Sequence, residues 1–309
     1  MKMRPAFKEI RSQIQQFGNP LNVVSSCLRG MIIPSEGCDF IGVDYSSIEA
    51  RITAWLANEK KVLSLFEKNK DVYVAAAAAI YGIPESEVTK DQRQVGKVAE
   101  LALGYGGGEG AFMQMSKGYG VKVAKNQATD IKIGWRNNRQ NTVQMWHALE
   151  QAAITAMKSN REVPTAHKVS YKKSGSFLLC RLPSDRFIIY PYPKLEWKMA
   201  PWGEQKETIT AKWVNSMTKK WERRDLWYGI LTENIVQALA RDILKEALLY
   251  LHKEGYEIVA HVHDEILVEI DKKILSVDYL IMLIYNSIPD WAEGLPIRAE
   301  GWRGVRYQK

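Results

Sequence analysis

The pattern of apolar and polar residues near the start of the chain predicts a strand followed by a helix. The short apolar run Phe40–Val43 is typical of a buried strand, which we expect to end at Asp44. Apolar residues then recur at Ile48, Ile52 and Leu56, which is the spacing of one helix face. We therefore expect a strand, a turn and a helix in this order, with Asp44 at the turn.

Helical patterns dominate the middle of the chain. Residues 71–80 form an alanine-rich helical pattern that stops at Gly82, and a second pattern runs from about residue 93 to 103. The glycine-rich residues 104–110 should end this second helix, because glycine favours helix termination. Residues 122–157 are amphipathic, which indicates further helix.

Strands and one long helix are expected in the second half of the chain. Apolar and polar residues alternate from 177 to 190 around the turn Pro183–Asp185, which is typical of a β-hairpin. Polar, tryptophan-containing strands should follow to Trp221. Residues 234–254 have the clearest helical periodicity, and Gly255 stands where a helix terminator is expected.

A final hairpin is predicted after this helix. The β-branched runs Glu257–Val262 and Ile266–Ile270 are separated by the polar tripeptide His263-Asp264-Glu265. Strands and helices in this uneven order favour the α+β class over a regular alternation of both.

Composition indicates a folded protein with an anionic partner. The 309 residues are 46% hydrophobic and 25% charged, which excludes disorder of the whole chain and allows two domains. A formal net charge of +8 favours a nucleic acid as partner, although many proteins without such a partner are mildly basic too. Three cysteines without a C-x-x-C pair favour a cytoplasmic setting, and no apolar run is long enough to span a membrane.

Two pairs of charged residues suggest a site for phosphoryl chemistry. Asp44 and Asp264 both end apolar strands, and carboxylates are the ligands that Mg²⁺ prefers, so the pair could hold two ions, with Glu265 in support. Arg93 and Lys97 lie four residues apart, share a helix face and could hold a triphosphate. For each residue alone, an ordinary turn or a solvated helix face explains the sequence at least as well.

A different class of metal enzyme remains open. His261 and His263 are two residues apart on an expected strand, so both would point to one side and could bind zinc for metal-dependent hydrolysis. No H-E-x-x-H spacing supports this hydrolase, and a packed histidine beside a turn explains His261 as well.

Taken together, these segments resemble DNA polymerase family A, which includes bacterial DNA polymerase I and many phage enzymes. Residues 44–51 resemble motif A of that family, and residues 93–97 with Tyr105 are similar to motif B, the nucleotide-binding helix of the fingers. Residues 263–265 look like motif C, and Gln237 matches the glutamine on the palm helix that precedes it. The phage-type subfamily is the most similar.

The resemblance implies how the chain is divided. We expect an α+β fold with a polymerase palm, which is an antiparallel sheet with helices, and mostly helical fingers. No thumb or exonuclease domain is expected in this chain. The palm would comprise residues 1–60, with motif A, and 223–309, with motif C, and the fingers and connecting hairpins would comprise residues 61–222.

The resemblance also implies a carboxylate site in the palm. Asp44 and Asp264 would hold two Mg²⁺ ions, with Tyr45 as a further metal ligand. The ions would serve the attack of a primer 3′-hydroxyl on the α-phosphorus of a nucleotide. Glu265 would be a nearby and less essential catalytic carboxylate.

Four residues of motifs A and B would bind the nucleotide if the resemblance holds. Arg93 and Lys97 would hold the triphosphate, and Tyr105 would flank the incoming base pair. Glu49 matches the steric gate, a side chain packed against C2′ of the sugar that leaves no room for a ribose hydroxyl. The site would therefore select deoxynucleotides.

The chain departs from the family at two neighbouring positions. Leu101, also expected in the nucleotide site, stands where the family often has an aromatic residue, and Glu100 stands where it often has Asn. Leucine has no π-face for stacking but can still make apolar contacts. We therefore expect altered selectivity for sugar analogues and no loss of the chemistry.

The expected partners are primer-template DNA and a dNTP. Gln237 and His263 would lie near the primer terminus or template, and Arg51 would also contact DNA. A second polypeptide with the thumb, and possibly an exonuclease, would complete a split polymerase in the cytoplasm, a host cytoplasm if the gene belongs to a phage. The alternative is an inactive, truncated remnant that binds nucleic acid.

Overall fold

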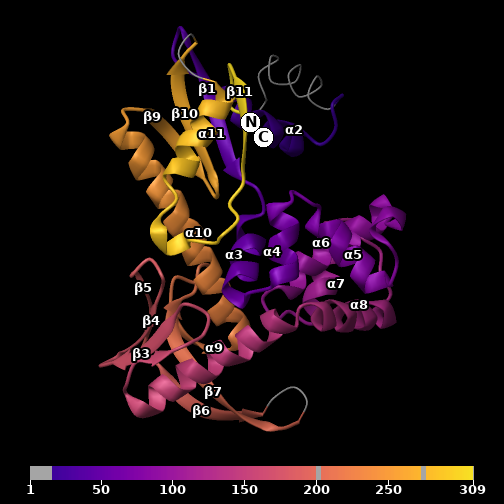
Figure 1. The fold of residues 1–309 in the computed structure, drawn as a ribbon, viewed down its shortest axis with the longest axis vertical. Coiled ribbons are helices and arrows are strands. Elements are labelled where there is room, and N and C mark those ends of the chain that lie inside the picture. The colour runs from indigo at the N-terminus through magenta and orange to yellow at the C-terminus, as the bar shows by residue number, and fades with distance from the viewer. Residues whose placement is uncertain (1–15, 200–202, 273–275, 309) are drawn as a thin grey trace, which may run out of the picture. The chain divides into compact units, whose positions relative to one another are not determined.

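The structure is a computed structural model that describes residues 16–199, 203–272 and 276–308 (Figure 1). It combines helices with antiparallel sheets, which confirms the predicted α+β class. Two compact units are distinguished, and each is described by itself. The first contains the described residues of Met1–Ser46, Leu244–Ile288 and Arg298–Lys309, and the second contains those of Ser47–Ile243 and Pro289–Ile297.

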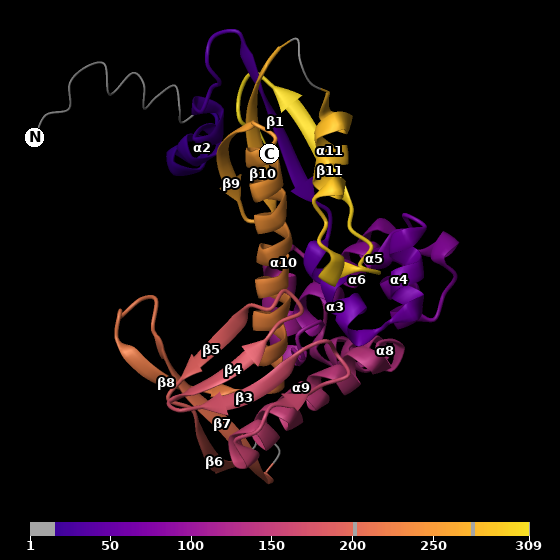
Figure 2. The ribbon, with the colours of Figure 1, turned by 60° about the vertical axis from the view of Figure 1, so that its left-hand side comes forward.

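The first unit is built on a four-stranded antiparallel sheet in the order β11-β1-β10-β9 (Figure 2). Helix α11 packs on β11 and β1. The elements are β1 Cys38–Tyr45, β9 Glu257–Val262, β10 Glu265–Asp271, β11 Ala299–Gly304, α2 Pro20–Cys27, η1 Arg29–Met31 and α11 Val277–Asn286. The predicted strand and final hairpin are present, but β1 continues past Asp44 to Tyr45, and Glu265 belongs to β10 instead of the turn.

Packing in this sheet explains the glycine in the middle of β1. Gly42 is in register with Trp302 of β11, and a Cβ atom at Gly42 would lie only 2.4 Å from the indole ring. Glycine is therefore needed for this close approach. Phe40, Leu267 and Tyr307 form the buried cluster beside the indole.

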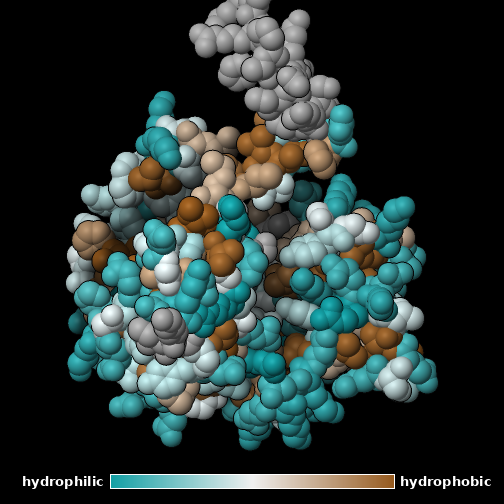
Figure 3. Space-filling view, turned by 90° about the horizontal axis from the view of Figure 1, so that it is seen from above, coloured by the Kyte–Doolittle hydropathy of each residue, from teal (hydrophilic) through white to brown (hydrophobic). Residues whose placement is uncertain are grey.

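Apolar side chains of the first unit also reach the surface. Phe17 and Leu21 are each 79% exposed, Met31 is 71% exposed, and α2 has no buried residue. Apolar patches interrupt the hydrophilic surface in the space-filling view (Figure 3). Such patches are typical of surfaces that bind another protein.

The second unit begins with a group of helices. They are α3 Ile48–Ala57, α4 Lys60–Glu67, α5 Val72–Tyr81, η2 Glu85–Glu87, α6 Lys90–Leu103, α7 Glu109–Gly118, α8 Lys125–Asn138 and α9 Gln140–Ser159, with η3 Asp290–Ala292 from later in the chain. Gly96 allows α5 and α6 to pack closely, because a Cβ there would lie 2.2 Å from the carbonyl oxygen of Tyr73. Thr89 and Gln92 form a capping box that starts α6.

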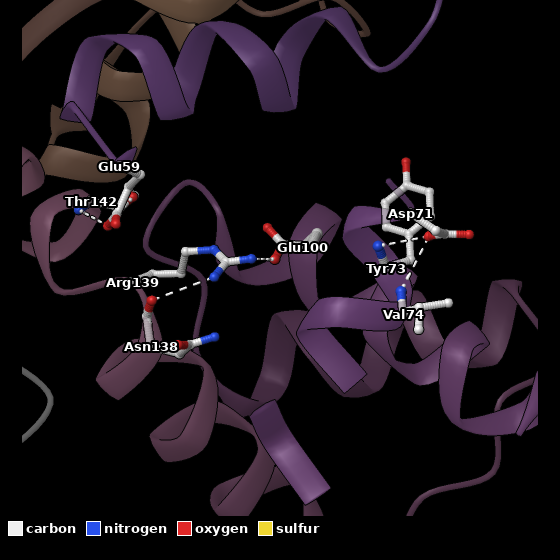
Figure 4. Close-up of polar contacts among 8 residues, drawn as sticks. All are labelled: Glu59, Asp71, Tyr73, Val74, Glu100, Asn138, Arg139 and Thr142. Atoms are coloured by element: carbon white, nitrogen blue, oxygen red, sulfur yellow. Dashed lines mark hydrogen bonds and ion pairs between the residues drawn. The ribbon is translucent and has the colours of Figure 1, made fainter. Parts of the chain in front are cut away.

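The amphipathic region predicted at 122–157 is divided between two helices, which meet at Arg139. The Arg139 guanidinium forms a buried ion pair with Glu100 of α6 (Figure 4). Glu59 accepts hydrogen bonds from the backbone N–H and the hydroxyl of Thr142, in the first turn of α9. These long-range contacts stabilise the break between α8 and α9 because they satisfy polar groups that are buried there.

Two antiparallel sheets and a long helix complete the second unit. The strands are β2 Val163–Pro164, β3 Ser170–Ser174, β4 Phe177–Arg181 and β5 Phe187–Pro191 in one sheet, and β6 Lys194–Met199, β7 Gln205–Val214 and β8 Trp221–Leu226 in the other. Helix α10 Tyr228–Lys253 follows and continues into the first unit. The buried Asp242 of α10 accepts hydrogen bonds from Ser184 and Arg186, which ties the β4–β5 hairpin to this helix.

The division into units does not coincide with the residue limits expected for palm and fingers. The compact units change after Ser46 and Ile243, whereas the expected limits lie at residues 60 and 222. Helix α3 packs against α4 and α9 and is therefore grouped with the second unit. Residues 1–15 of the expected palm lie outside the described residues. None of the described helices is long and apolar enough to cross a bilayer.

Candidate active site

In the first unit, strand pairing gathers the predicted catalytic carboxylates at one end of β1 and β10. Asp44 is in register with Glu265, and the backbone N–H of Tyr45 donates to the carbonyl oxygen of Asp264 at 3.3 Å. Residues in register on neighbouring antiparallel strands point to the same face of the sheet. Asp44 and Glu265 therefore share a face of the sheet, and the backbone of Asp264 lies beside that of Tyr45, although these residues are far apart in the sequence.

Glu265 is held in place by two buried aromatic residues. Its Oε1 accepts a hydrogen bond from Trp302 Nε1 at 3.1 Å, and its Oε2 accepts one from the Tyr307 hydroxyl at 2.6 Å. Glu265 is only 1% exposed. Both carboxylate oxygens are thus engaged by the protein.

Tyr307 should stabilise the first unit through this contact. Burial, followed by the hydrogen bond to Glu265, raises the pKa of Tyr307 to about 12. Tyr307→Phe should lower the free energy of unfolding by about 1–3 kcal/mol at neutral pH, because the buried carboxylate loses a donor. The folded pKa lies above the ordinary 10.0, so this stabilisation is complete below pH 10 and is lost as the pH rises through about 12.

Urea unfolding of wild type and Tyr307→Phe between pH 7 and 12 measures this effect, with Tyr250→Phe on α10 as control. The difference between wild type and Tyr307→Phe should shrink above pH 10. Equal stability of the two proteins at pH 7, or a difference that stays constant to pH 12, would show that the hydrogen bond does not stabilise the fold.

His263 does not continue the strand that precedes it. It occupies the two-residue turn between β9 and β10 with φ of 55°, in the left-handed region. The alternation that would place it beside His261 ends at Val262, so the basis for a zinc hydrolase is lost. Within the described residues, no group of three or more His, Cys, Asp or Glu side chains could hold a metal.

The Tyr45 side chain is part of the core. It is 3% exposed, and burial raises the pKa of its hydroxyl above the usual value. A buried, neutral phenol is a poor metal ligand. What Tyr45 can offer to a hard cation is its main-chain carbonyl oxygen.

In the second unit, α6 presents the two predicted triphosphate ligands. Arg93 Nε forms an ion pair with Asp71 Oδ2 at 2.6 Å, and its guanidinium lies 5.5 Å from the ring centroid of Tyr73. Asp71 also caps α5 by accepting the N–H groups of Tyr73 and Val74 (Figure 4). Lys97, one turn further along α6, has its ammonium 5.4 Å from the ring centroid of Tyr119.

Glu49, the expected steric gate, is fixed from two sides. Its Oε2 accepts a hydrogen bond from the Tyr105 hydroxyl at 2.8 Å, and its Oε1 accepts one from Gln237 Nε2 at 2.6 Å. Burial, then the nearby Glu49 carboxylate, raises the pKa values of Tyr105 and of Glu233. Three predicted site residues are thus in direct contact, and Tyr105 stays protonated as a donor.

The two departures from the family pattern line the same small cavity. Leu101 lines the same small cavity as Glu49 and Tyr105, so it is placed to contact whatever binds beside the gate. Glu100 forms the buried ion pair with Arg139, which gives it a role in holding α6 against the following helices.

The Arg51 side chain is buried in the protein and does not lie on a surface that DNA could contact. It is 5% exposed, its Nη1 donates to the carbonyl oxygen of Pro296 at 2.7 Å, and its guanidinium lies 4.3 Å from the ring centroid of Phe66. A side chain buried in this way does not present its charge to a phosphate, so we leave Arg51 out of the DNA-contacting set.

Several residues of these sites were not found by sequence reasoning. Asp71 was recognised only as the beginning of a helix, and the ion pair that orients Arg93 gives no local signal. Trp302 and Tyr307, which hold Glu265, follow no periodic pattern. A buried acidic residue needs partners, so a search for donors to Glu265 could have found them once the fold was known.

Comparisons with known proteins identify the family to which the sequence is related. The sequence profile of DNA polymerase family A matches residues 14–166. The DNA polymerase of Bacillus phage SP02 is 37% identical over 295 residues, which are 95% of this chain and 45% of that protein. DNA polymerase I of Aquifex aeolicus is 28% identical over 150 residues, which are 47% of this chain and 26% of that protein.

A solved structure shares the fold. The POL domain of Pol1 from M. smegmatis, in complex with DNA primer-template and dNTP, has a TM-score of 0.58 at 17% identity and covers 91% of this chain and 42% of that chain. This likeness shows that the chain has the fold of a polymerase domain. The chain belongs to DNA polymerase family A. It spans less than half the length of the relatives named here.

Proposed function

We propose that this chain is the palm and fingers of a template-directed DNA polymerase. In the proposed reaction, the primer 3′-oxygen bonds to the α-phosphorus of a dNTP, the bond to the β-phosphate oxygen breaks, and pyrophosphate and a proton leave. The observation that carries the proposal is the register of β1 and β10, which groups Asp44 with Asp264 at one end of the sheet.

Asp44 and Asp264 are proposed to hold two Mg²⁺ ions, with the carbonyl oxygen of Tyr45 as a further ligand. Their carboxylates fit the metal, because Mg²⁺ is usually bound by one or two carboxylates together with substrate phosphates. When bound, the ions neutralise the charge on the phosphate oxygens. Glu265 is held by hydrogen bonds from Trp302 and Tyr307. It is proposed to be a nearby carboxylate that the reaction needs less than Asp44 and Asp264.

Arg93 and Lys97 are proposed to bind the triphosphate. The Asp71 carboxylate orients Arg93, so the guanidinium needs less ordering when a phosphate binds. Tyr73 joins this set, since its ring lies beside Arg93 and its hydroxyl is 3.3 Å from Ser47 Oγ. Tyr105 is proposed to flank the incoming base pair, and Glu49 to select the sugar.

Gln237 and His263 are proposed to contact the primer terminus or template. Gln237 has an amide that can donate to DNA, and it already bonds Glu49. We keep residues 1–60 and 223–309 as the proposed palm and 61–222 as the proposed fingers, with the compact units as a separate division of the fold. The proposed setting is the cytoplasm, that of a host if the gene belongs to a phage.

A second polypeptide with the thumb, and possibly an exonuclease, is proposed to complete the enzyme. Its support is the exposed apolar surface around Phe17, Leu21 and Met31, which a partner would remove from water. The edge strands β9 and β11 offer a second kind of contact, because unpaired strand edges can accept another strand.

Leu101→Phe should change the discrimination against dideoxynucleotides. Phenylalanine adds an aromatic ring to the cavity that Leu101 shares with Glu49 and Tyr105, so contacts with the sugar and base change. We expect the ratio of dNTP to ddNTP incorporation to shift by roughly tenfold, the effect of a small change in an apolar pocket. Competitive primer extension measures the ratio, with Leu63→Phe as a control, and an unchanged ratio would remove Leu101 from the nucleotide site.

Primer extension tests the proposed function. The purified chain is incubated with primed DNA, Mg²⁺ and dNTPs, alone and with the proposed second polypeptide. Extension only with that polypeptide would support the split enzyme, whereas extension by the chain alone would replace it with a polymerase that needs no partner. No extension in either case, with Asp44→Ala identical to wild type, would leave an inactive remnant that binds nucleic acid.

A further inference from the structure

The sheet β6-β7-β8 carries cations that none of the proposed roles uses. Lys194 is in register with Thr210, and Lys212, two residues further along β7, is in register with Arg223 of β8. Register partners, and residues two apart on a strand, share a face of the sheet. Lys194, Lys212 and Arg223 therefore share one face, which also carries Glu196 and Asp225.

Tyr192, in the connection between β5 and β6, lies beside two of these cations and is fixed by its surroundings. Its N–H donates to the carbonyl oxygen of Ser176 at 2.7 Å, and its own carbonyl oxygen accepts from Arg223 Nη1 at 2.9 Å. Lys212 Nζ lies 5.5 Å from its ring centroid. Its φ of 51° is unusual for a bulky residue, and these contacts hold it there while the residue remains 53% exposed.

A groove lined by Lys212 lies near this tyrosine. Its lining residues come mainly from strand β5, strand β7 and helix α10, all within the second unit. The groove is lined by Lys212, by the exposed side chains of Phe187 and Ile189, and by Gln237 of α10. Among the described residues that line the groove there is no Asp or Glu. Gln237 also bonds Glu49, which connects the groove to the nucleotide site.

We propose that this groove and the neighbouring Tyr192 bind the unpaired template strand, with one unpaired base stacked on Tyr192 and the phosphates beside Lys212. A positive groove with exposed aromatic rings is the usual means of binding single-stranded nucleic acid. A single strand is favoured over a duplex because only an unstacked base can offer its face to an isolated ring. The inference rests on the proposed function, since it assumes that the chain uses a template.

A fluorescent base tests this site directly. Primed templates carry 2-aminopurine at successive positions of the single-stranded overhang, and its quenching is measured with the full chain. One or two positions should be quenched by wild type and by Tyr192→Phe, which keeps the ring, and not by Tyr192→Ala. The alanine variant keeps the backbone contacts with Ser176 and Arg223, so it should fold. Trp197→Ala removes an aromatic residue that is 68% exposed on the opposite face and should change nothing.

Affinity gives a second readout. Tyr192→Ala should bind overhang DNA roughly tenfold more weakly than wild type and should bind blunt duplex equally well, because base stacking on one ring is lost. Lys212→Gln should reduce the slope of log affinity against log salt by about 0.7, the effect of one phosphate contact to a single strand.

The outcomes separate this inference from the proposed function. Quenching that survives in Tyr192→Ala, equal losses on overhang and blunt DNA, or no binding of overhang DNA by wild type would each overturn the template groove. Wild type that shows the expected quenching but never extends the primer would keep the groove as a binding site and would contradict the polymerase activity.

Discussion

Asp44→Ala and Asp264→Ala should each reduce nucleotide addition by roughly a thousandfold or more, because each removes a carboxylate proposed to hold a catalytic ion. DNA affinity should stay nearly unchanged, since carboxylates do not attract phosphates. Single-turnover extension measures the first effect and fluorescence anisotropy with labelled primer-template measures the second. The register that places these residues together predicts the same behaviour for both variants.

Asp271→Ala is the matched control for this prediction. Asp271 ends the same strand, β10, at its other end, opposite Cys38. The Asp271→Ala enzyme should therefore extend primers as wild type does. If Asp44→Ala or Asp264→Ala kept near-wild-type extension, the assignment of these residues as metal ligands would be wrong.

Glu49→Ala should admit ribonucleotides. The wild-type carboxylate is held by Tyr105 and Gln237, so it cannot swing aside to make room for a 2′-hydroxyl. Alanine removes this obstacle, and the preference for dNTP over rNTP should fall by roughly 10- to 100-fold, as for other changes of pocket size. The ratio of kcat/KM values for the two nucleotides measures the preference.

Two further variants separate size from charge at this gate. Glu49→Gln keeps the volume of the side chain and should retain most of the selectivity, whereas Glu233→Ala removes a neighbouring carboxylate and should leave the selectivity unchanged. A Glu49→Ala enzyme that is as selective as its parent would show that another residue excludes the ribose.

Local patterns were sufficient to predict the elements that carry the site. The apolar run before Asp44 and the periodicity of residues 234–254 depend only on neighbours in the sequence, and β1 and α10 are found there. The helix begins earlier than predicted, at Tyr228, and the buried Leu231, four residues before Ile235, already belongs to its apolar face. The resemblance of the motifs in these elements then indicated the protein family, which periodicity alone could not do.

Contacts between distant residues could not be predicted in this way. Arg51 has the charge of a DNA-binding residue, but its partners Phe66 and Pro296 were not visible from the motif. The pairing of His261 with His263 assumed an unbroken strand, and the positive φ of His263 ends that strand. Tertiary packing decides both cases, and only the fold reveals it.

The most direct test of the central claim is incorporation of a single nucleotide opposite each of the four template bases. Incorporation by wild type, Asp264→Ala and Asp271→Ala is measured with Mg²⁺ and one dNTP at a time. The proposed second polypeptide is added if extension requires it. The polymerase assignment predicts that wild type and Asp271→Ala add only the complementary nucleotide, and that Asp264→Ala adds none. Addition that ignores the template base, or that persists in Asp264→Ala, would contradict it.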